Sequence, residues 1–129
     1  MRNRLGKLEL QVMKLIWDKG QATVKEVWEE LYPEKRLAYT TVATVMKQLE
    51  GKKFLNHSEK ERTYIYHPSI DQKSVSQGLL KELIDGLFDG SAAKLITTLV
   101  QGDQITKKDL EEIQQIILNY RKSEVDKNG

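Results

Sequence analysis

Apolar residues recur at helical spacing near the start of the chain. They occupy the positions i, i+4, i+7 and i+8, at Leu8, Val12, Leu15 and Ile16. This pattern predicts a helix over residues 5–18 with one buried stripe. We expect Gly20 to end the helix, because glycine adopts the left-handed backbone of a helix C-cap without steric cost.

A second short helix is predicted to begin at a capping box, in which Thr23 is the N-cap and Glu26 lies three residues later. Its apolar face carries Val24, Val27, Trp28 and Leu31. Pro33 stops this helix, because a proline ring clashes with the preceding turn. Residues 34–37 then form the loop to the next segment.

Residues 38–55 are the most informative part of the sequence. Their apolar positions lie at i, i+3, i+4 and i+7, at Val42, Val45, Met46 and Leu49, and predict one helix that runs into Gly51. The opposite face carries hydroxyls, an amide and one cation, from Thr40, Thr41, Thr44, Lys47 and Gln48. None of these is a catalytic group, whereas all of them bond well to phosphate oxygens and to base edges in a DNA major groove.

A β-hairpin is predicted directly after this helix. Residues 54–58 and 63–67 are two β-prone runs, and residues 59–62 between them form a polar four-residue loop. Alternation along the second strand places Tyr64 and Tyr66 on one face. Lys60 and Arg62 at the tip are in a position to reach phosphates or a minor groove; a solvated tip is the alternative. Three short helices followed by such a hairpin predict a winged helix-turn-helix that binds DNA, over residues 1–70.

The remaining residues, 71–129, show three further helical patterns. They cover residues 72–88, residues 92–101 after Ser91 as N-cap, and a last segment that opens with Thr106 and Asp109. About 50 residues with this much apolar surface can hardly form a core of their own. We therefore predict a dimerisation domain, with packing back on the N-terminal domain as the alternative. Its apolar stripes include Leu83, Leu87, Leu95, Leu99, Leu110, Ile113 and Ile117.

Composition narrows the functional classes. Of 129 residues, 39% are hydrophobic and 31% charged, which is typical of a globular protein. No run reaches about 18 apolar residues, and the first seven residues lack the apolar core of a signal peptide. Cysteine is absent, which excludes disulfides and thiolate metal sites. We expect a cytoplasmic protein without membrane insertion, without a cofactor and without an enzymatic site.

The charges are unevenly distributed, although the net charge is only +2. Residues 1–72 carry 13 Lys and Arg against 10 Asp and Glu, whereas residues 73–129 carry 8 against 9. A polyanionic partner should therefore bind the N-terminal part. An ordinary solvated surface explains these charges about equally well.

An ordered set of motifs resembles the penicillinase-repressor family, which includes the β-lactamase, methicillin-resistance and copper-operon repressors. Residues 8–17 (LELQVMKLIW) are similar to the first helix of that family, E-x-x-V-M-x-x-I-W. The similarity continues through YTTV at 39–42, RTYIY at 62–66, LFDGS at 87–91 and LEEI at 110–113. No single motif is decisive, but the ordered set covers nearly the whole chain.

The resemblance implies a mainly α protein with a winged helix-turn-helix, followed by a three-helix dimerisation domain. A homodimer would bind double-stranded operator DNA at an inverted repeat and block transcription. The DNA contacts of the family fall on Ala38, Tyr39, Thr40, Thr41, Thr44 and Lys47 of this chain. Several relatives carry a basic residue where this chain has Ala43 and Gln48, so operator preference is expected to differ.

The resemblance also bears on release from DNA. Copper-operon repressors carry a Cys-x-Cys pair near the C-terminus, which this chain lacks. In β-lactam-responsive members, an Asn-Phe bond in the dimerisation domain is cleaved, and the aligned bond here is Thr98–Leu99. A membrane sensor-protease is one candidate source of the inducing signal.

Two other functional hypotheses use the same sequence. The modest charge allows a winged-helix protein-interaction module that does not bind DNA. His57 and His67, the two histidines, are interpreted as ordinary hairpin residues; as the alternative, they could approach each other across the hairpin and serve a metal-responsive regulator. Trp17 and Trp28 lie on apolar helical faces and are interpreted as core residues, with a small-ligand pocket as the alternative.

Overall fold

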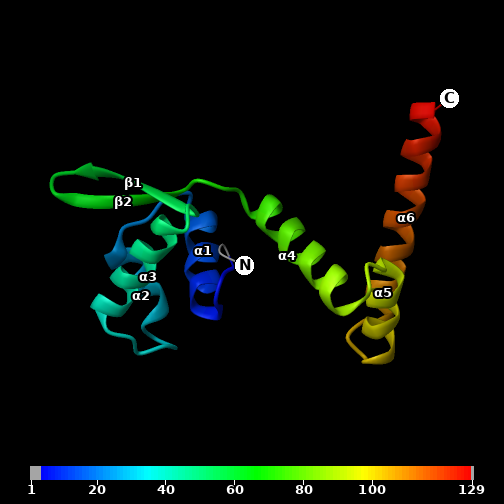
Figure 1. Ribbon diagram of the computed structural model, residues 1–129, viewed down its shortest axis with the longest axis horizontal. Coiled ribbons are helices and arrows are strands. Elements are labelled where there is room, and N and C mark those ends of the chain that lie inside the picture. The colour runs from blue at the N-terminus through cyan, green and yellow to red at the C-terminus, as the bar shows by residue number, and fades with distance from the viewer. Residues whose placement is uncertain (1–3, 129) are drawn as a thin grey trace. The chain divides into compact units, whose positions relative to one another are not determined.

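The computed structural model describes residues 4–128 and is mainly helical (Figure 1). Residues 1–3, the first part of the stretch expected not to be a signal peptide, lie outside the described residues. The elements are, in order, α1 (Lys7–Lys19), α2 (Val24–Leu31), α3 (Tyr39–Gly51), β1 (Leu55–Lys60), β2 (Thr63–Pro68), α4 (Gln72–Leu87), α5 (Ala92–Gln101) and α6 (Lys107–Asn128). The predicted fold class is confirmed: three helices and a hairpin precede three further helices.

Local signals fix where the first helices begin and end. Gly20 caps α1 with a positive φ of 87°, and its N–H donates to the carbonyl of Ile16. At the start of α2, the Thr23 hydroxyl accepts from the Glu26 N–H, and the Glu26 carboxylate accepts from the Thr23 N–H. The predicted capping box is therefore confirmed. The helix predicted within residues 38–55 ends at Gly51, and the chain enters β1 at Leu55.

The hairpin β1–β2, called the wing below, differs from the prediction at its tip. Lys60 pairs with Thr63, so the connection is a two-residue turn and the predicted four-residue loop is wrong. Both turn residues, Glu61 and Arg62, have positive φ angles of 52° and 66°. Such a turn matches the right-handed twist of paired strands, which is why pairing continues up to it.

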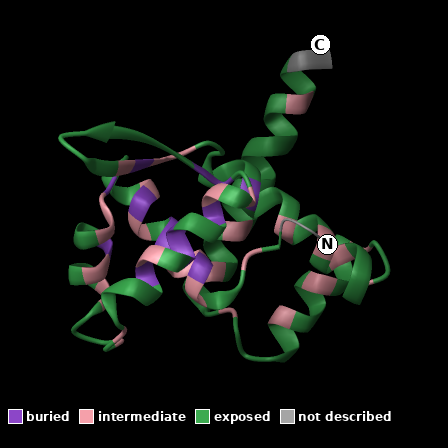
Figure 2. Ribbon diagram, turned by 60° about the vertical axis from the view of Figure 1, so that its left-hand side comes forward, coloured by how far each residue is buried: buried purple, intermediate pink, exposed green. Residues whose placement is uncertain are grey.

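The core lies where α1, α2, α3 and the base of the wing meet (Figure 2). Its largest fully buried side chains are Met13, Ile16, Met46, Leu49, Leu55, Val12, Val27 and Val42. Six of these residues come from the predicted apolar stripes of the three helices, whereas Met13 of α1 and Leu55 of β1 add to them. A bridge between Ala22 and Tyr66 adds two backbone hydrogen bonds of 2.9 and 2.8 Å and joins the α1–α2 connection to β2.

The chain forms two compact units, and the first extends to Leu80. It includes the start of α4, where Val75 is buried in the core and Leu79 packs against it. The Asp71 carboxylate accepts from the Ser74 N–H at this helix start, and such hydrogen bonds lower the pKa of Asp71. The sequence placed the domain boundary after residue 70, within this unit; that boundary stays a prediction.

The second unit begins at Lys81 and contains the end of α4 together with α5 and α6. The Ser91 hydroxyl accepts from the Lys94 N–H and caps α5, as expected. Thr106 and Asp109 exchange hydrogen bonds with each other's N–H groups just before and at the start of α6. Among the described residues, no helix is both long and apolar enough to span a membrane.

Candidate nucleic-acid interface

The outer face of α3 is polar and exposed, as its sequence pattern predicts. Its exposed positions include Tyr39, Thr40, Thr41, Thr44, Lys47 and Gln48. The Thr44 hydroxyl donates to the Thr40 carbonyl at 2.8 Å. Because that bond uses the hydroxyl hydrogen, Thr44 retains acceptor lone pairs and a methyl group for an outside partner.

Trp28 positions the start of α3. Its indole N–H donates to the Leu37 carbonyl at 2.9 Å, just before the helix begins. Its ring also lies against the ring of Tyr39, with a centroid distance of 5.9 Å. Trp28 packs partly buried against the core, as does Trp17, whose indole N–H donates to the Ile70 carbonyl at 3.0 Å. Both tryptophans therefore border the core without being fully buried.

A groove of about 640 Å³ lies between the start of α2, the side of α3 and the wing. Three cationic side chains line it, from Lys25, Lys47 and Arg62. The other lining residues are Thr23, Val24, Tyr39, Ala43, Thr63, Tyr64 and Tyr66. Hydroxyls, rings and cations from three elements therefore converge on one concave surface, a composition suited to a phosphate backbone.

Three of the predicted DNA-contact residues line this groove, and Lys60 does not. Tyr39, Lys47 and Arg62 line the groove, whereas Lys60 is exposed beside the turn. Ala38 is the N-cap of α3 and provides no side-chain capping bond. The DNA-binding roles of all these residues stay predictions.

Lys25 also lines the groove, although its sequence context did not mark it as a DNA-contact residue. It lies in the first turn of α2, and its bond with Glu29 is long, at 4.0 Å between exposed side chains. The only available signal was its place just after the Thr23 capping box, because a helix start favours anions. Its position beside Lys47 and Arg62 depends on how α2, α3 and the wing pack.

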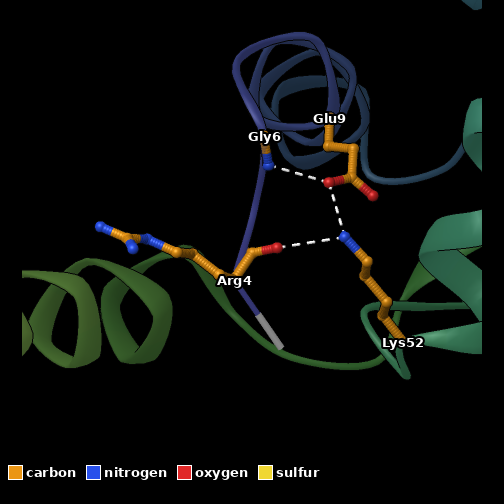
Figure 3. Close-up of polar contacts among 4 residues, drawn as sticks. All are labelled: Arg4, Gly6, Glu9 and Lys52. Atoms are coloured by element: carbon orange, nitrogen blue, oxygen red, sulfur yellow. Dashed lines mark hydrogen bonds and ion pairs between the residues drawn. The ribbon is translucent and has the colours of Figure 1, made fainter. Parts of the chain in front are cut away.

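Glu9 and Lys52 tie the end of α3 to the start of α1 (Figure 3). The Lys52 ammonium donates to Glu9 Oε1 at 2.7 Å and to the Arg4 carbonyl at 3.1 Å, and the Gly6 N–H donates to the same carboxylate at 2.8 Å. Burial raises the pKa of Glu9, but the hydrogen bonds and charge of Lys52, with the Gly6 bond, outweigh it. The pKa of Glu9 therefore lies below its usual value.

The two histidines point to opposite faces of the wing. His57 pairs with Tyr66, whereas His67 pairs with Asn56, the neighbour of His57. Because successive strand residues alternate between faces, the alternative in which the two rings approach each other is wrong. Within residues 4–128, no three His, Asp or Glu side chains are grouped so that they could hold a metal ion.

The predicted dimerisation residues lie on helices with incompletely buried apolar faces. Leu87 is 69% exposed and Ile117 is 49% exposed, while Leu95, Leu99 and Ile113 are half-buried. The Thr98–Leu99 bond lies inside α5, where the Thr98 hydroxyl donates to the Lys94 carbonyl at 2.9 Å. Nothing in this geometry distinguishes that bond as a protease site.

Comparison with known proteins gives a consistent result. A family model described as "Penicillinase repressor" matches residues 5–119. The penicillinase repressor of Bacillus licheniformis is 25% identical over 118 residues, which are 92% of each chain. The methicillin resistance regulatory protein MecI of Staphylococcus aureus (strain N315) is 21% identical over 113 residues, covering 88% of this chain and 92% of MecI. The solution structure of the DNA-binding domain of the repressor BlaI is 32% identical with a TM-score of 0.51, covering 56% of this chain and 88% of that domain.

Proposed function

The chain belongs to the penicillinase-repressor family, and we propose that it represses transcription by binding operator DNA through its winged helix. The observation that carries this proposal is the convergence of Lys25, Lys47 and Arg62 on one groove beside the polar face of α3. Cations that come from three separate elements fit a phosphate backbone, which runs past all of them at once. A protein-interaction module would need an acidic partner surface to account for the same convergence.

Within this interface, we assign different tasks to the two kinds of side chain. Thr40, Thr41 and Thr44 on the outer face of α3 contact base edges in the major groove and provide sequence preference. The groove cations, with Lys60 at the wing tip, contact phosphates and provide affinity that depends on salt. Ala43 and Gln48 supply no cation, so α3 contributes less charge than in relatives with basic residues there.

A second copy of the same chain is the proposed partner of the C-terminal helices. Support comes from the apolar side chains of α4, α5 and α6 that remain partly exposed in the single chain, including Leu83, Leu87, Leu110 and Ile117. Faces of this kind are typical of interfaces. A two-fold dimer presents two winged helices to an inverted repeat, and linking the two contacts raises operator affinity.

Release of this dimer from DNA is proposed to follow cleavage or unfolding within α5. The Thr98–Leu99 bond is held in a regular helix, and a protease must bind its substrate as an extended chain. Cleavage there therefore requires local opening of α5 first. A membrane sensor-protease is the proposed partner for such a signal, and its gene would be expected near that of the repressor.

The proposed function is tested by titrating the full chain against labelled DNA from upstream of its own gene. A random duplex of the same length serves as the control. We expect tighter binding to the upstream DNA, with an affinity for both that falls steeply with salt. Equal, weak binding to both at low salt would refute the assignment for that DNA, and lack of any salt-dependent binding would favour the interaction module.

A further inference from the structure

Three side chains connect the end of α3 with the outer part of the wing. The Glu50 carboxylate lies 2.6 Å from His57 Nδ1, so it joins α3 to β1. The His57 ring stacks on the Tyr64 ring of β2, with centroids 4.0 Å apart and planes 13° from parallel. We call Glu50, His57 and Tyr64 the wing brace.

The hydrogen bond in the wing brace has a defined direction. A carboxylate accepts hydrogen bonds and cannot donate them, so His57 Nδ1 carries the proton. Both side chains are about 30% exposed, at 30% for Glu50 and 29% for His57. The pair therefore lies in the surface of the unit and does not belong to the buried core.

The wing brace begins at the pair where the core holds the hairpin, because His57 pairs with Tyr66, and it extends toward the tip through the stack of His57 on Tyr64. Tyr66 is buried, and its backbone pairs with Ala22. Toward the tip, the strands are largely exposed, and a two-stranded hairpin is at best marginally stable by itself. Contacts that reach beyond Tyr66 are therefore needed to fix its outer half. The bond from Glu50 holds the His57 ring, and the stack of that ring on Tyr64 passes this support toward the tip.

We propose that the wing brace positions the wing against α3 and thereby sets operator affinity, although Glu50 and His57 need not contact DNA. This proposal rests on the proposed function. Tyr64 lines the groove next to Arg62, so the angle of the wing determines where Arg62 lies relative to Lys47. A loosened wing carries the same cations, but it no longer holds them at one spacing that matches a phosphate backbone.

The direction in which one substitution changes DNA affinity distinguishes a positioning role from a simple effect of charge. Glu50 is an anion beside a surface proposed to bind a polyanion, so charge alone predicts that Glu50→Ala strengthens DNA binding. The wing brace predicts the opposite, because the variant frees His57 from α3. Glu59→Ala is the matched control: it removes a carboxylate from the same face of the wing, opposite Tyr64 and outside the brace.

The experiment measures binding of the full-length wild type and variants to the upstream duplex over a range of salt concentrations. Glu50→Ala and His57→Phe, which keeps a ring for stacking, should each weaken binding by about fivefold or more. Their plots of log K against log salt should flatten toward that of Lys60→Ala/Arg62→Ala, which loses up to about 1.8 in slope for two phosphate contacts. Glu59→Ala should bind as well as the wild type, or more tightly.

A second measurement keeps the test independent of folding. In the Lys60→Ala/Arg62→Ala background, adding Glu50→Ala should cause little further loss, because the wing has no cations left to position. The proposal would be overturned if the affinity losses from Glu50→Ala and from Lys60→Ala/Arg62→Ala were fully additive. It would also be overturned if Glu50→Ala alone bound DNA as tightly as the wild type, or more tightly. A wild type that binds no DNA would refute the proposed function and leave the salt slopes without meaning, so the two failures are distinguishable.

Discussion

The first compact unit and the C-terminal helices contain apolar stripes of the same kind but use them differently. In the first unit, the stripes of α1, α2 and α3 converge, and Met46 and Val27 are 0% exposed. In the second unit, equally regular stripes leave Leu87 and Ile117 substantially exposed. Periodicity therefore predicts a helix with an apolar face, whereas the elements packed against that face determine whether the same chain covers it.

A charge on the exposed apolar face of α5 should have the strongest consequence for function. Leu99→Asp places a charge on the proposed interface of α5, where burial without a partner is costly. We expect monomers in sedimentation at micromolar concentration, with the winged helix still folded. Operator affinity should fall by up to about 10²–10⁴-fold as the linkage of two half-sites is lost. A Leu99→Asp chain that stays dimeric would argue against α5 as the interface.

The next effect concerns the buried side of the comparison. Met46→Ala removes a fully buried side chain from the core of the first unit. We expect the free energy of unfolding of that unit to fall by about 2–5 kcal/mol, because truncating the side chain leaves a cavity in the core. Denaturant unfolding followed by tryptophan fluorescence measures this loss, since Trp17 and Trp28 both pack against this core. At concentrations where the variant is folded, the dimer should persist, in contrast with Leu99→Asp.

Threonine substitutions on α3 should have a smaller effect on DNA affinity, and a threonine of the second unit serves as their control. Thr41→Ala and Thr44→Ala should each weaken binding to the preferred duplex by about 1–3 kcal/mol, the usual cost of a lost base contact. Thr97→Ala is the matched control, because its hydroxyl donates to the Ala93 carbonyl as that of Thr44 donates to Thr40. Thermal unfolding should barely change in any of the three. If the double Thr41→Ala/Thr44→Ala variant binds as tightly as the wild type, α3 is not the reading helix.

The smallest effect is a pH dependence in the first unit. The folded-state pKa of Glu9 is lowered, so Glu9 stabilises the fold above its ordinary pKa, and this contribution is lost as the pH falls through the folded-state pKa. We expect Glu9→Gln to lower the free energy of unfolding by about 1 kcal/mol at pH 7, and the difference from the wild type to shrink toward pH 3. Asp89→Asn is the control: it breaks the exposed Lys94–Asp89 pair of the second unit, and its unfolding midpoint should not move. An equal loss at both pH values would assign the Glu9 effect to packing.

Much of the fold was predictable because its signals are local. The capping box of Thr23 and Glu26, the C-cap at Gly20 and the face shared by Tyr64 and Tyr66 each depend on residues a few positions apart. The wing tip was predicted less well. A polar stretch of four residues looks like a loop in sequence, but cross-strand pairing of Lys60 with Thr63 shortens it to two residues.

Residues close together along the chain were therefore enough to predict the helices, their apolar faces, the polar face of α3 and the resemblance to a family of repressors. Tertiary packing selected the side chains that share the groove, because Lys25, Lys47 and Arg62 come together only when α2, α3 and the wing pack. It also decided that Glu50 reaches His57 and that His67 lies on the other face. The physical reason is range: helix and turn formation depend on neighbours along the chain, whereas a binding surface depends on which elements the buried core brings together.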